Sequence, residues 1–376
     1  MIMMRRPDHL APFLLVSLLA TVHLAGPVGA AKFVCNAGDS GGTSKCQSLI
    51  GYTAGNATTL NGVMSLFGIH SLRSLLGANG LPLSTPPSRP VPAGATVRVR
   101  LDCACSTGYG ASSRHPVYRV RHGVTLDAIA RDVFGGLVTD KEIAAASNIS
   151  DPGSVQGGQD IYIPLPCSCD EVGSEAVVHY AHVAAAGSSV SEIAAEFGTT
   201  EETLVKLNGI SDPKSLEAGQ VLDVPLRACS SSISNVSMDH GLHVPNGSYI
   251  LTAGNCVICS CSSSSWQLDC YPTKGISTSV CPIATCGDLS LGNSSPSSAC
   301  ESTICAYAGY TDSNGSLNIL TNLTTQSSCD NNAGEQQSQA SDGSYLLPSG
   351  MQWAYVVAIS ISISINRRLL DFLLRG

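Results

Sequence analysis

Charged residues are scarce in this 376-residue chain, and so are aromatic ones. Asp, Glu, Lys and Arg make up 13% of it, about half of the quarter that is usual for soluble domains. The hydrophobic fraction of 43% nevertheless argues against a charge-rich disordered chain. The net charge of −8 and the lack of any Lys/Arg run longer than a pair argue against nucleic-acid binding. Aromatic residues at 5% argue against a large sugar cleft walled by rings.

The chain nevertheless has sixteen cysteines, and the sequence at its start predicts that they form disulfides. Arg5 and Arg6, the apolar stretch 10–24 and the small residues 28–30 make up a secretory signal peptide over residues 1–30. The alternative is a membrane anchor, but a membrane span needs about 20 apolar residues, and the stretch 10–24 is shorter. An even number of cysteines in a secreted chain favours disulfides. Seven sequons predict N-glycosylation at Asn56, Asn148, Asn235, Asn246, Asn293, Asn314 and Asn322.

An internal repeat dominates the middle of the chain. Residues 149–164 and 210–225 share eight of sixteen positions at an offset of 61 residues. The segments before them, 123–130 and 187–194, match as well. A weaker third copy lies earlier, where residues 94–105 align with 158–169 and both end in Cys-x-Cys. The repeat predicts tandem modules.

Each copy is predicted to run strand, helix, helix, strand. In the second copy, residues 117–121 and 161–163 have the pattern of strands, and Asp151-Pro152 predicts a turn. Four apolar residues recur there at helical spacing: Leu126, Ile129, Ala130 and Val133. Three capping boxes are expected to open helices, namely Thr139-x-x-Glu142, Ser189-x-x-Glu192 and Thr199-x-x-Glu202.

The residues that carry this pattern resemble the LysM family. They are Tyr118-x-Val120-x-x-Gly123-x-Thr125-Leu126, then the run Asn-Ile-Ser-Asp-Pro at 148–152, then Gly158-Gln159-x-Ile161-x-Ile163-Pro164. Three copies joined by Cys-x-Cys pairs are similar to the extracellular part of plant LysM receptors, above all the GPI-anchored chitin-elicitor-binding and peptidoglycan-binding LysM proteins. The resemblance is specific over residues 35–229 and weaker beyond. The first copy departs most, because residues 79–92 lengthen its second loop.

The resemblance implies an α+β fold: three tandem βααβ LysM modules joined by Cys-x-Cys disulfides and followed by a small Cys-rich region. The expected boundaries are a signal peptide at 1–30, a divergent first module at 35–105, a second at 117–166, a third at 178–227, a Cys-rich region with ten cysteines at 229–330, and a low-complexity spacer with a GPI-anchor signal at 331–376.

The resemblance also implies a disulfide pairing: Cys35–Cys105, Cys46–Cys169 and Cys103–Cys167. Spacing alone leaves fifteen pairings open for six cysteines. A metal cluster is the alternative, since His240-x-x-His243 with Cys256-x-x-Cys259-x-Cys261 would look like zinc ligands in a cytosolic protein. The signal peptide favours disulfides and no metal.

In the LysM family, β-1,4-linked N-acetylglucosamine polymers lie in a shallow groove between the strand–helix loop and the helix–strand loop. By resemblance, the glycan-binding residues of the second module are Arg121, His122, Gly123, Val124 and Thr125 on one wall and Ile149, Ser150, Asp151, Pro152, Gly153 and Ser154 on the other. Those of the third module are Ser188, Ser189, Ile210, Ser211, Asp212 and Pro213. The alternative is that Gly123 and Asp151-Pro152 only shape turns. Glycans at Asn56 or Asn148 would narrow the grooves of the first or second module.

An enzyme is not expected. Gly38-Asp39-Ser40-Gly41-Gly42 resembles the nucleophile motif of trypsin-like proteases, but in that family the His and Asp lie upstream, where this chain has its signal peptide. We interpret the motif as a loop between Cys35 and Cys46. A wall hydrolase would need paired carboxylates or a metal site, and the Cys-rich region holds few acids. No cofactor is expected.

The end of the chain predicts a GPI anchor attached at Asn332, with Ser341 as the runner-up, ahead of a 13-residue apolar run at 353–365. Arg367, Arg368 and Asp371 interrupt the tail, so secretion is an alternative. A membrane span is another, although it would bury those charges at roughly 2.5–3.5 kcal/mol each.

The expected function is that of a plant innate-immunity receptor on the extracellular face of the plasma membrane. It would bind chitin or peptidoglycan oligosaccharides and signal through a LysM receptor-like kinase, with homo- or hetero-oligomers of related LysM proteins as a further assembly. The alternative is a secreted structural wall glycoprotein that binds chitin-like polymer without signalling.

Overall fold

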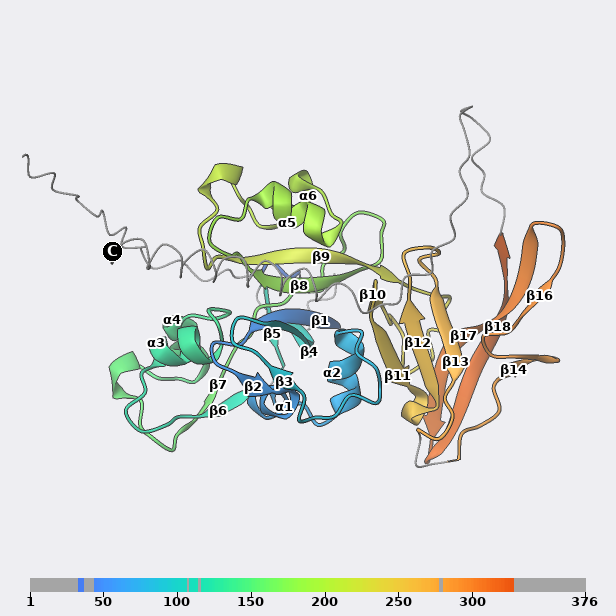
Figure 1. Ribbon diagram of the computed structural model, residues 1–376, viewed down its shortest axis with the longest axis horizontal. Coiled ribbons are helices and arrows are strands. Elements are labelled where there is room, and N and C mark those ends of the chain that lie inside the picture. Colours follow the sequence, from blue (N-terminus) through green and yellow to red (C-terminus); the bar gives the residue numbers. More distant parts are fainter. Residues whose placement is uncertain (1–32, 37–43, 107, 114–115, 277–279, 328–376) are drawn as a thin grey trace, which may run out of the picture. The chain divides into compact units, whose positions relative to one another are not determined.

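The computed structural model describes residues 33–36, 44–106, 108–113, 116–276 and 280–327 (Figure 1). The predicted signal peptide, the Gly38–Gly42 motif, and the GPI segment with Asn332 and Ser341 lie outside the described residues. Within the described residues, no helix is long and apolar enough to cross a bilayer.

Three successive units each run strand, helix, helix, strand. The first unit comprises β1 (Ser44–Thr53), β2 (Thr58–Thr59), α1 (Leu60–Phe67), α2 (Leu72–Ala78), β3 (Pro90–Val91) and β4 (Thr96–Ser106), followed by β5 (Tyr109–Ser112). The second comprises β6 (Val117–Arg119), α3 (Leu126–Ala128) with a π-helical turn (Ile129–Val133), α4 (Asp140–Ala146), a 3-10 turn (Pro152–Ser154) and β7 (Asp160–Tyr162). The third comprises β8 (Val177–Val183), α5 (Val190–Phe197), α6 (Glu201–Leu207), a 3-10 turn (Pro213–Ser215) and β9 (Val221–Cys229).

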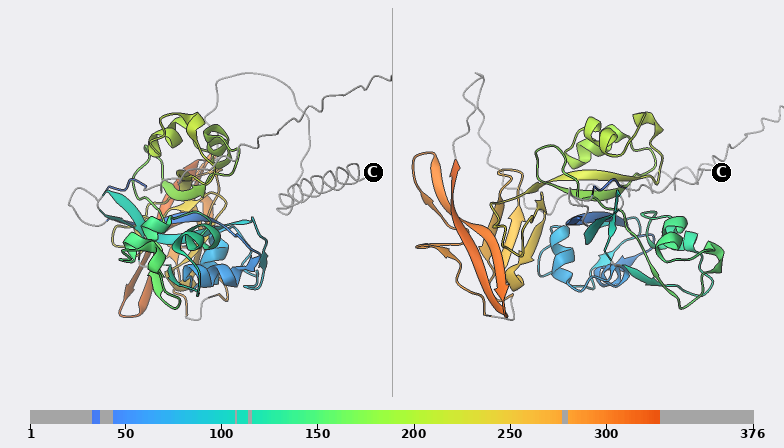
Figure 2. Two further views of the ribbon diagram at one scale, coloured as in Figure 1. Left: turned by 90° about the vertical axis from the view of Figure 1, so that its left-hand side faces the viewer. Right: turned by 180° about the vertical axis from the view of Figure 1, so that it is seen from behind.

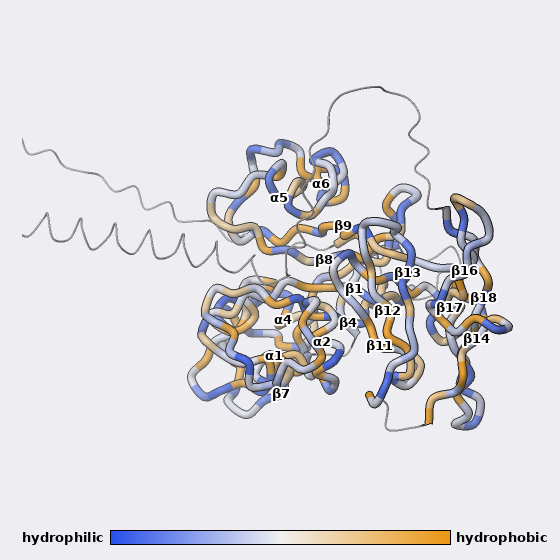
Figure 3. Tube along the Cα trace, turned by 45° about the vertical axis from the view of Figure 1, so that its right-hand side comes forward, coloured by the Kyte–Doolittle hydropathy of each residue, from blue (hydrophilic) through white to orange (hydrophobic). Residues whose placement is uncertain are grey.

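The first and third units share one six-stranded sheet. Its strand order is β10-β9-β8-β1-β4-β5, in which β1 and β8 pair in parallel with Leu49 opposite Tyr180. Helices α5 and α6 lie over one face of β8 and β9 (Figure 2), and β9 is hydrophobic along most of its length (Figure 3). The second unit keeps its own two-stranded sheet, β6–β7. The predicted strand–helix order is present, but the sharing of a sheet between two units was not predicted.

The first and second units also share a hydrophobic core, whereas most of the third unit packs in a second cluster, together with Leu49 and Ala78 of the first. Phe67 and Phe134 meet edge to face with ring centroids 5.8 Å apart, and Leu126 and Ile129 are buried as the helical spacing predicts. In the third unit, Val190 lies in a separate cluster. Burial stabilises by about 1.5–3 kcal/mol per large side chain, so both clusters contribute strongly to stability.

The first helices of the three units end alike. Each is followed by a glycine with positive φ, at Gly68, Gly135 and Gly198 (65°, 63° and 70°), which is the usual left-handed end of a helix. The π-helical turn adds one residue to the second unit. Phe134 directly precedes the glycine that ends this helix, as Phe67 and Phe197 do in the other two units.

Two of the three predicted capping boxes are confirmed, and one is wrong. Thr139 with Glu142 and Ser189 with Glu192 form reciprocal boxes. Helix α6 is instead capped by Thr200, whose hydroxyl accepts from the Thr203 N–H. The Thr199 N–H donates to Ala194 O (3.0 Å) and closes the end of α5, so it is not free to bond the Glu202 side chain as a capping box requires.

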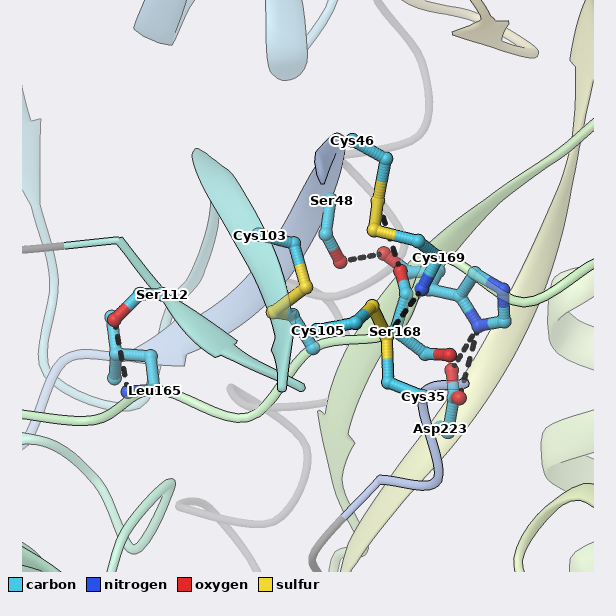
Figure 4. The surroundings of a disulfide bond; sticks show 12 residues. Cys35, Cys46, Ser48, Cys103, Cys105, Ser112, Leu165, Ser168, Cys169 and Asp223 are labelled. Atoms are coloured by element: carbon cyan, nitrogen blue, oxygen red, sulfur yellow. Dashed lines mark hydrogen bonds and ion pairs between the residues drawn. A yellow bond between two sulfur atoms is a disulfide. The ribbon is translucent and has the colours of Figure 1, made fainter. Parts of the chain in front are cut away.

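Three disulfides cluster beside β1 and β4 (Figure 4). They are the pairs that the resemblance implies: Cys35–Cys105, Cys46–Cys169 and Cys103–Cys167. The sulfur atoms of Cys35, Cys103, Cys105 and Cys169 lie within 4.8 Å of one another. Each of the four is disulfide-bonded, so none has a thiolate to offer a metal ion.

The Cys-rich region consists of antiparallel sheets of two or three strands, except that β10 pairs with β9 in the six-stranded sheet. Its strands are β10 (Val244–Pro245), β11 (Tyr249–Thr252), β12 (Val257–Cys261), β13 (Leu268–Pro272), β14 (Thr285–Cys286), β15 (Leu289–Ser290), β16 (Ser294–Pro296), β17 (Glu301–Ser313) and β18 (Ser316–Ser327). Four disulfides have both cysteines among the described residues of this region and its border with β9: Cys229–Cys261, Cys256–Cys281, Cys259–Cys270 and Cys286–Cys305. The three cysteines of the zinc alternative are therefore all in disulfides.

Candidate functional site

The loops that would form a groove are framed by the same hydrogen bond in all three units. A glycine N–H at the end of the second loop donates over 2.8 Å to a carbonyl at the start of the first loop. The pairs are Gly94 to Ala54, Gly158 to Val120, and Gly219 to Ala184. These glycines have φ of 79°, 87° and 85°, a conformation that other residues adopt only under strain. The frame fixes where both loops leave the strands.

The first loop ends at a hydroxyl that caps the following helix. Thr59, Thr125 and Ser189 each accept from the backbone N–H three residues later, over 3.2 Å. Thr125 and Ser189 were predicted as glycan-binding residues. Their side-chain oxygens act here as helix N-caps, so any role in binding would rest on their remaining hydrogen-bonding capacity and on the loop shape that they fix.

The first loop of the second unit presents two basic side chains. Arg121, His122 and Gly123 are exposed, and Val124 is half-buried against the core. The His122 ring lies directly over Gly157, since a Cβ there would come 2.3 Å from the ring Nδ1. His122 therefore bridges the first loop and the end of the second.

The second loop of the second unit is a turn set by Asp151. Its carboxylate accepts from the Gly153 N–H over 2.9 Å and opens the 3-10 turn. Ile149 packs on the core while Ser150, Asp151 and Gly153 are exposed, and Pro152 is half-buried. The structure thus brings the two predicted walls to the same end of the unit.

The third unit repeats this turn, but its first loop is uncharged. Asp212 accepts from the Lys214 N–H over 3.0 Å, and the Ser188 hydroxyl donates to Ala185 O over 2.7 Å. Ser211 and Asp212 are exposed, while Ile210 and Pro213 are half-buried. Alanines at 185 and 186 stand where the second unit has Arg121 and His122, so the third unit lacks that basic pair.

The first unit differs, because its two loops are joined to each other. Strands β2 and β3 pair Thr58 with Val91 and Thr59 with Pro90. Two further backbone bonds continue the closure, from Leu60 N to Arg89 O (3.1 Å) and from Asn61 N to Pro87 O (2.8 Å). The lengthened loop noted in the sequence folds back onto the first loop. Backbone groups that would serve a ligand here bond one another instead.

The Cys-rich region also contacts this end of the first unit. The Tyr249 hydroxyl donates to Leu81 O over 2.7 Å. Leu81 takes the place of Ile149 and Ile210, because all three N–H groups bond back to the preceding helix in the same way. Sequence reasoning missed this contact, and the only hint was the departure of residues 79–92 from the repeat.

All seven sequon asparagines are exposed. Asn148 adopts φ of 54° directly after α4, where the first and third units have Gly80 and Gly209 with φ of 60° and 59°. Asparagine tolerates this left-handed position better than most residues. The second unit thereby carries its sequon next to the wall that starts at Ile149.

A buried ionisable pair, which the sequence analysis did not predict, joins β8 and β9 of the shared sheet. His179 Nδ1 lies 2.8 and 2.9 Å from the two Asp223 carboxylate oxygens, and His179 Nε2 lies 2.7 Å from Asp170 O. Burial lowers the pKa of His179, but the hydrogen bond and charge of Asp223 outweigh it, and the net pKa is raised. Burial raises the pKa of Asp223 against the opposing hydrogen bond from His179. Ser48 of β1 donates to His179 O, so the pair sits where the first and third units join (Figure 4).

Comparison with known proteins gives two matches to the LysM domain family model, over residues 118–164 and 182–225. The chain is 46% identical over 300 residues to the chitin elicitor-binding protein of Oryza sativa subsp. japonica, covering 80% of this chain and 83% of that protein. It is 45% identical over 286 residues to LysM domain-containing GPI-anchored protein 2 of Arabidopsis thaliana, covering 75% and 81%. A crystal structure of the ectodomain of a receptor like kinase is 20% identical with a TM-score of 0.40, covering 48% of this chain and 90% of that one.

Proposed function

The chain belongs to the plant LysM domain-containing GPI-anchored proteins, and from this premise we propose that it is a non-catalytic receptor for glycans that contain N-acetylglucosamine, such as chitin or peptidoglycan fragments. The observation that carries the proposal is the 46% identity, over 80% of the chain, to a protein named for binding a chitin elicitor. The names of the relatives describe binding and anchoring, which supports a role without catalysis.

Three LysM modules are proposed, at residues 35–105, 117–166 and 178–227. The family model matches the second and third. Support for the first is the loop frame that it shares with the others and one further contact. The residue that ends the second helix bonds both backbone groups of one closing-strand residue in every unit: Asn79 with Arg98, Ser147 with Tyr162, and Asn208 with Asp223.

The second and third modules are the proposed binding sites, and the first is proposed to be a scaffold. A groove with backbone N–H and C=O groups on both walls suits the acetamide of N-acetylglucosamine, and a small apolar spot suits its methyl group. The half-buried Val124 and Ile149 offer such a spot in the second module. In the first module the corresponding loops are paired through β2 and β3.

Weak single sites fit a receptor for polymers. A shallow groove buries few sugar rings, and the loops described above carry no Trp, Tyr or Phe. Two grooves on one chain would raise the affinity for a long glycan through effective concentration, provided that the spacing suits both. A long glycan would also bridge two receptors.

The chain acts at the extracellular face of the plasma membrane, where its GPI-anchored relatives are held. Attachment at Asn332, or at Ser341, is part of the proposal. A lipid anchor gives no path across the bilayer, so signalling would need a transmembrane partner. A LysM receptor kinase is the proposed partner.

The first test is retention of the purified chain on insoluble chitin, peptidoglycan and cellulose, with soluble oligomers as competitors. Retention on an N-acetylated polymer but not on cellulose supports the proposal and names the ligand. Retention on none, by folded and disulfide-intact protein, refutes it.

Matched variants assign the groove. Ser150→Trp and Ser211→Trp add the same bulk at equivalent exposed positions of the second and third modules. Ser150→Ala removes the Asn148 sequon without adding bulk, so it separates the effect of the glycan from that of the obstruction. Loss of retention in Ser150→Trp but not in Ser150→Ala would assign binding to the second module.

A further inference from the structure

We propose that the N-linked glycan on Asn246 is an ordered part of the fold, with its first N-acetylglucosamine ring packed against the Trp266–Arg227 pair. This inference is independent of the glycans that the protein recognises as ligands. It assigns a structural role to one sequon out of seven.

The Asn246 side chain is held in one orientation. Asn246 lies in a tight turn in which the Ser248 N–H donates to Pro245 O over 3.1 Å, and Gly247 has φ of 73°. The Asn246 carboxamide oxygen accepts from the Ser263 N–H over 3.0 Å. The Asn246 N–H donates to Arg227 O over 3.3 Å. Fixing the oxygen and the backbone also fixes the direction of Nδ2, the atom to which an N-linked sugar is attached.

The turn itself cannot move freely. The Gly247 N–H donates to Cys261 O over 3.1 Å, and Cys261 is tied to Cys229 by a disulfide. On its other side, a Cβ at Gly80 would come 2.5 Å from Gly247 O. A sugar on Asn246 would therefore start from a rigid base between the first unit and the Cys-rich region.

Trp266 is held in an unusual conformation beside this turn. Its φ is 54°, which a bulky residue adopts only when its surroundings impose it. Its N–H donates to Ser262 O over 3.3 Å, and its carbonyl accepts from the Ser230 N–H over 3.4 Å. Ser262 to Trp266 thus form one closed loop, and Ser263, the partner of Asn246, lies inside it.

Arg227 contacts both Asn246 and Trp266. Its carbonyl accepts from Asn246, while its guanidinium carbon lies 4.1 Å from the centre of the Trp266 ring. Glu175 lies 3.4 Å from the same guanidinium and orients it. The Arg227 guanidinium covers one face of the Trp266 ring. The first sugar would meet the aromatic surface that remains with its C–H face, and the guanidinium and the carboxylate with its hydroxyl and acetamide groups.

The test measures how fast each glycan is released from the native, full chain. The protein is produced in kifunensine-treated cells, digested with PNGase F in ¹⁸O water, and each site is followed by mass spectrometry. Asn314, exposed at the tip of the β17–β18 hairpin with φ of 54°, is the internal comparison. We expect release at Asn246 to be about tenfold slower than at Asn314 in the native protein, and equal to it after denaturation.

Trp266→Leu should raise the native rate at Asn246 towards that at Asn314 and leave Asn314 unchanged. Arg227→Ala, which removes the guanidinium and keeps the strand, should act in the same direction. An Asn246 without a glycan, equal native rates at the two sites, or a slow rate that neither variant changes would each overturn the inference. If Trp266→Leu is not secreted, the native rates and Arg227→Ala decide it.

Discussion

At the scale of single residues, the buried His179–Asp223 pair links stability to pH. Both ring nitrogens of His179 face acceptors, the Asp223 carboxylate and Asp170 O. The pair therefore holds a proton more tightly in the folded chain than its members do when unfolded, in line with the raised pKa of each. A folded state that binds more protons loses stability as the pH rises.

We therefore expect the melting temperature of the protein to fall as the pH rises above about 6.5, the pKa of an unfolded histidine. The contribution of the pair is complete below that pH and is lost as the pH passes the raised pKa of folded His179. The measurement is a thermal melt at several pH values. The double variant His179→Gln, Asp223→Asn keeps similar shapes but removes both titrating groups, so a fall as steep as that of the unmodified protein would contradict this origin.

Removing one partner alone tests the same pair at a fixed pH. His179→Leu leaves the Asp223 carboxylate buried without its donor, and such a loss costs roughly 3–5 kcal/mol of unfolding free energy. Chemical denaturation of the oxidised protein measures it. The cost should shrink when Asp223→Leu is added, because two apolar side chains then replace the pair. An equal or larger cost in the double variant would show that the charge was not the cause.

At the scale of elements, the local signals in the sequence predicted well what is local in the structure. The capping boxes at Thr139 and Ser189 and the turn at Asp151 concern residues within a few positions of each other. The cap of α6 was placed one residue early, because the way α5 ends could not be read from the sequence.

The long-range pairings could not be predicted in the same way. The pairing of β1 with β8, and that of β2 with β3, joins residues that are distant in the sequence. The residue pattern of a strand does not indicate which other strand it pairs with. The candidate site was similarly divided. The two walls of each groove in the second and third units stay a prediction from the sequence. The closure of the first unit and the capping by Thr125 and Ser189 could be seen only in the structure.

Asn208, which ends α6, allows a test of the contact between the second helix and the closing strand that all three units share. Asn208 bonds both backbone groups of Asp223, over 2.7 and 2.9 Å, and Leu204 O over 2.9 Å. Asn208→Ala should lower the unfolding free energy by roughly 1–3 kcal/mol, because the backbone groups of Asp223 lose their partner. Asn208→Ser should cost less, since Ser147 makes the corresponding contacts in the second unit. A serine variant no better than alanine in a thermal melt would contradict this account.

Substitution of Gly77 in α2 by alanine should destabilise the protein, whereas the same substitution at most helical glycines stabilises it. Glycine to alanine inside a helix normally stabilises by roughly 0.5–1 kcal/mol. At Gly77, however, a Cβ would come 2.2 Å from the backbone oxygen of Tyr249. Gly77→Ala should therefore lower the melting temperature by forcing the Cys-rich region away from α2. Tyr249→Phe, which removes only the hydrogen bond to Leu81 O, is the milder control, and a stabilised Gly77→Ala protein would refute the contact.

At the scale of the whole molecule, the disulfide cluster and the shared sheet hold small units together. A single unit of about 50 to 70 residues buries little surface and is marginal alone. Here the first unit draws on the second for its core and on the third for its sheet. The Cys46–Cys169 bond joins β1 to the segment that leads into β8, across 123 residues of sequence. The groove loops thus depend on bonds far from them.

Loss of that disulfide should therefore loosen the grooves. Replacing both Cys46 and Cys169 with serine should lower the unfolding free energy by at most roughly 5 kcal/mol, because the other two crosslinks shorten the effective loop. Retention on chitin or peptidoglycan should fall with it, as it should on full reduction and alkylation. Serine at Cys286 and Cys305, which close 19 residues of the Cys-rich region, should cost roughly 3 kcal/mol and leave retention intact. Full retention by the reduced, alkylated protein would show that the grooves do not need the framework.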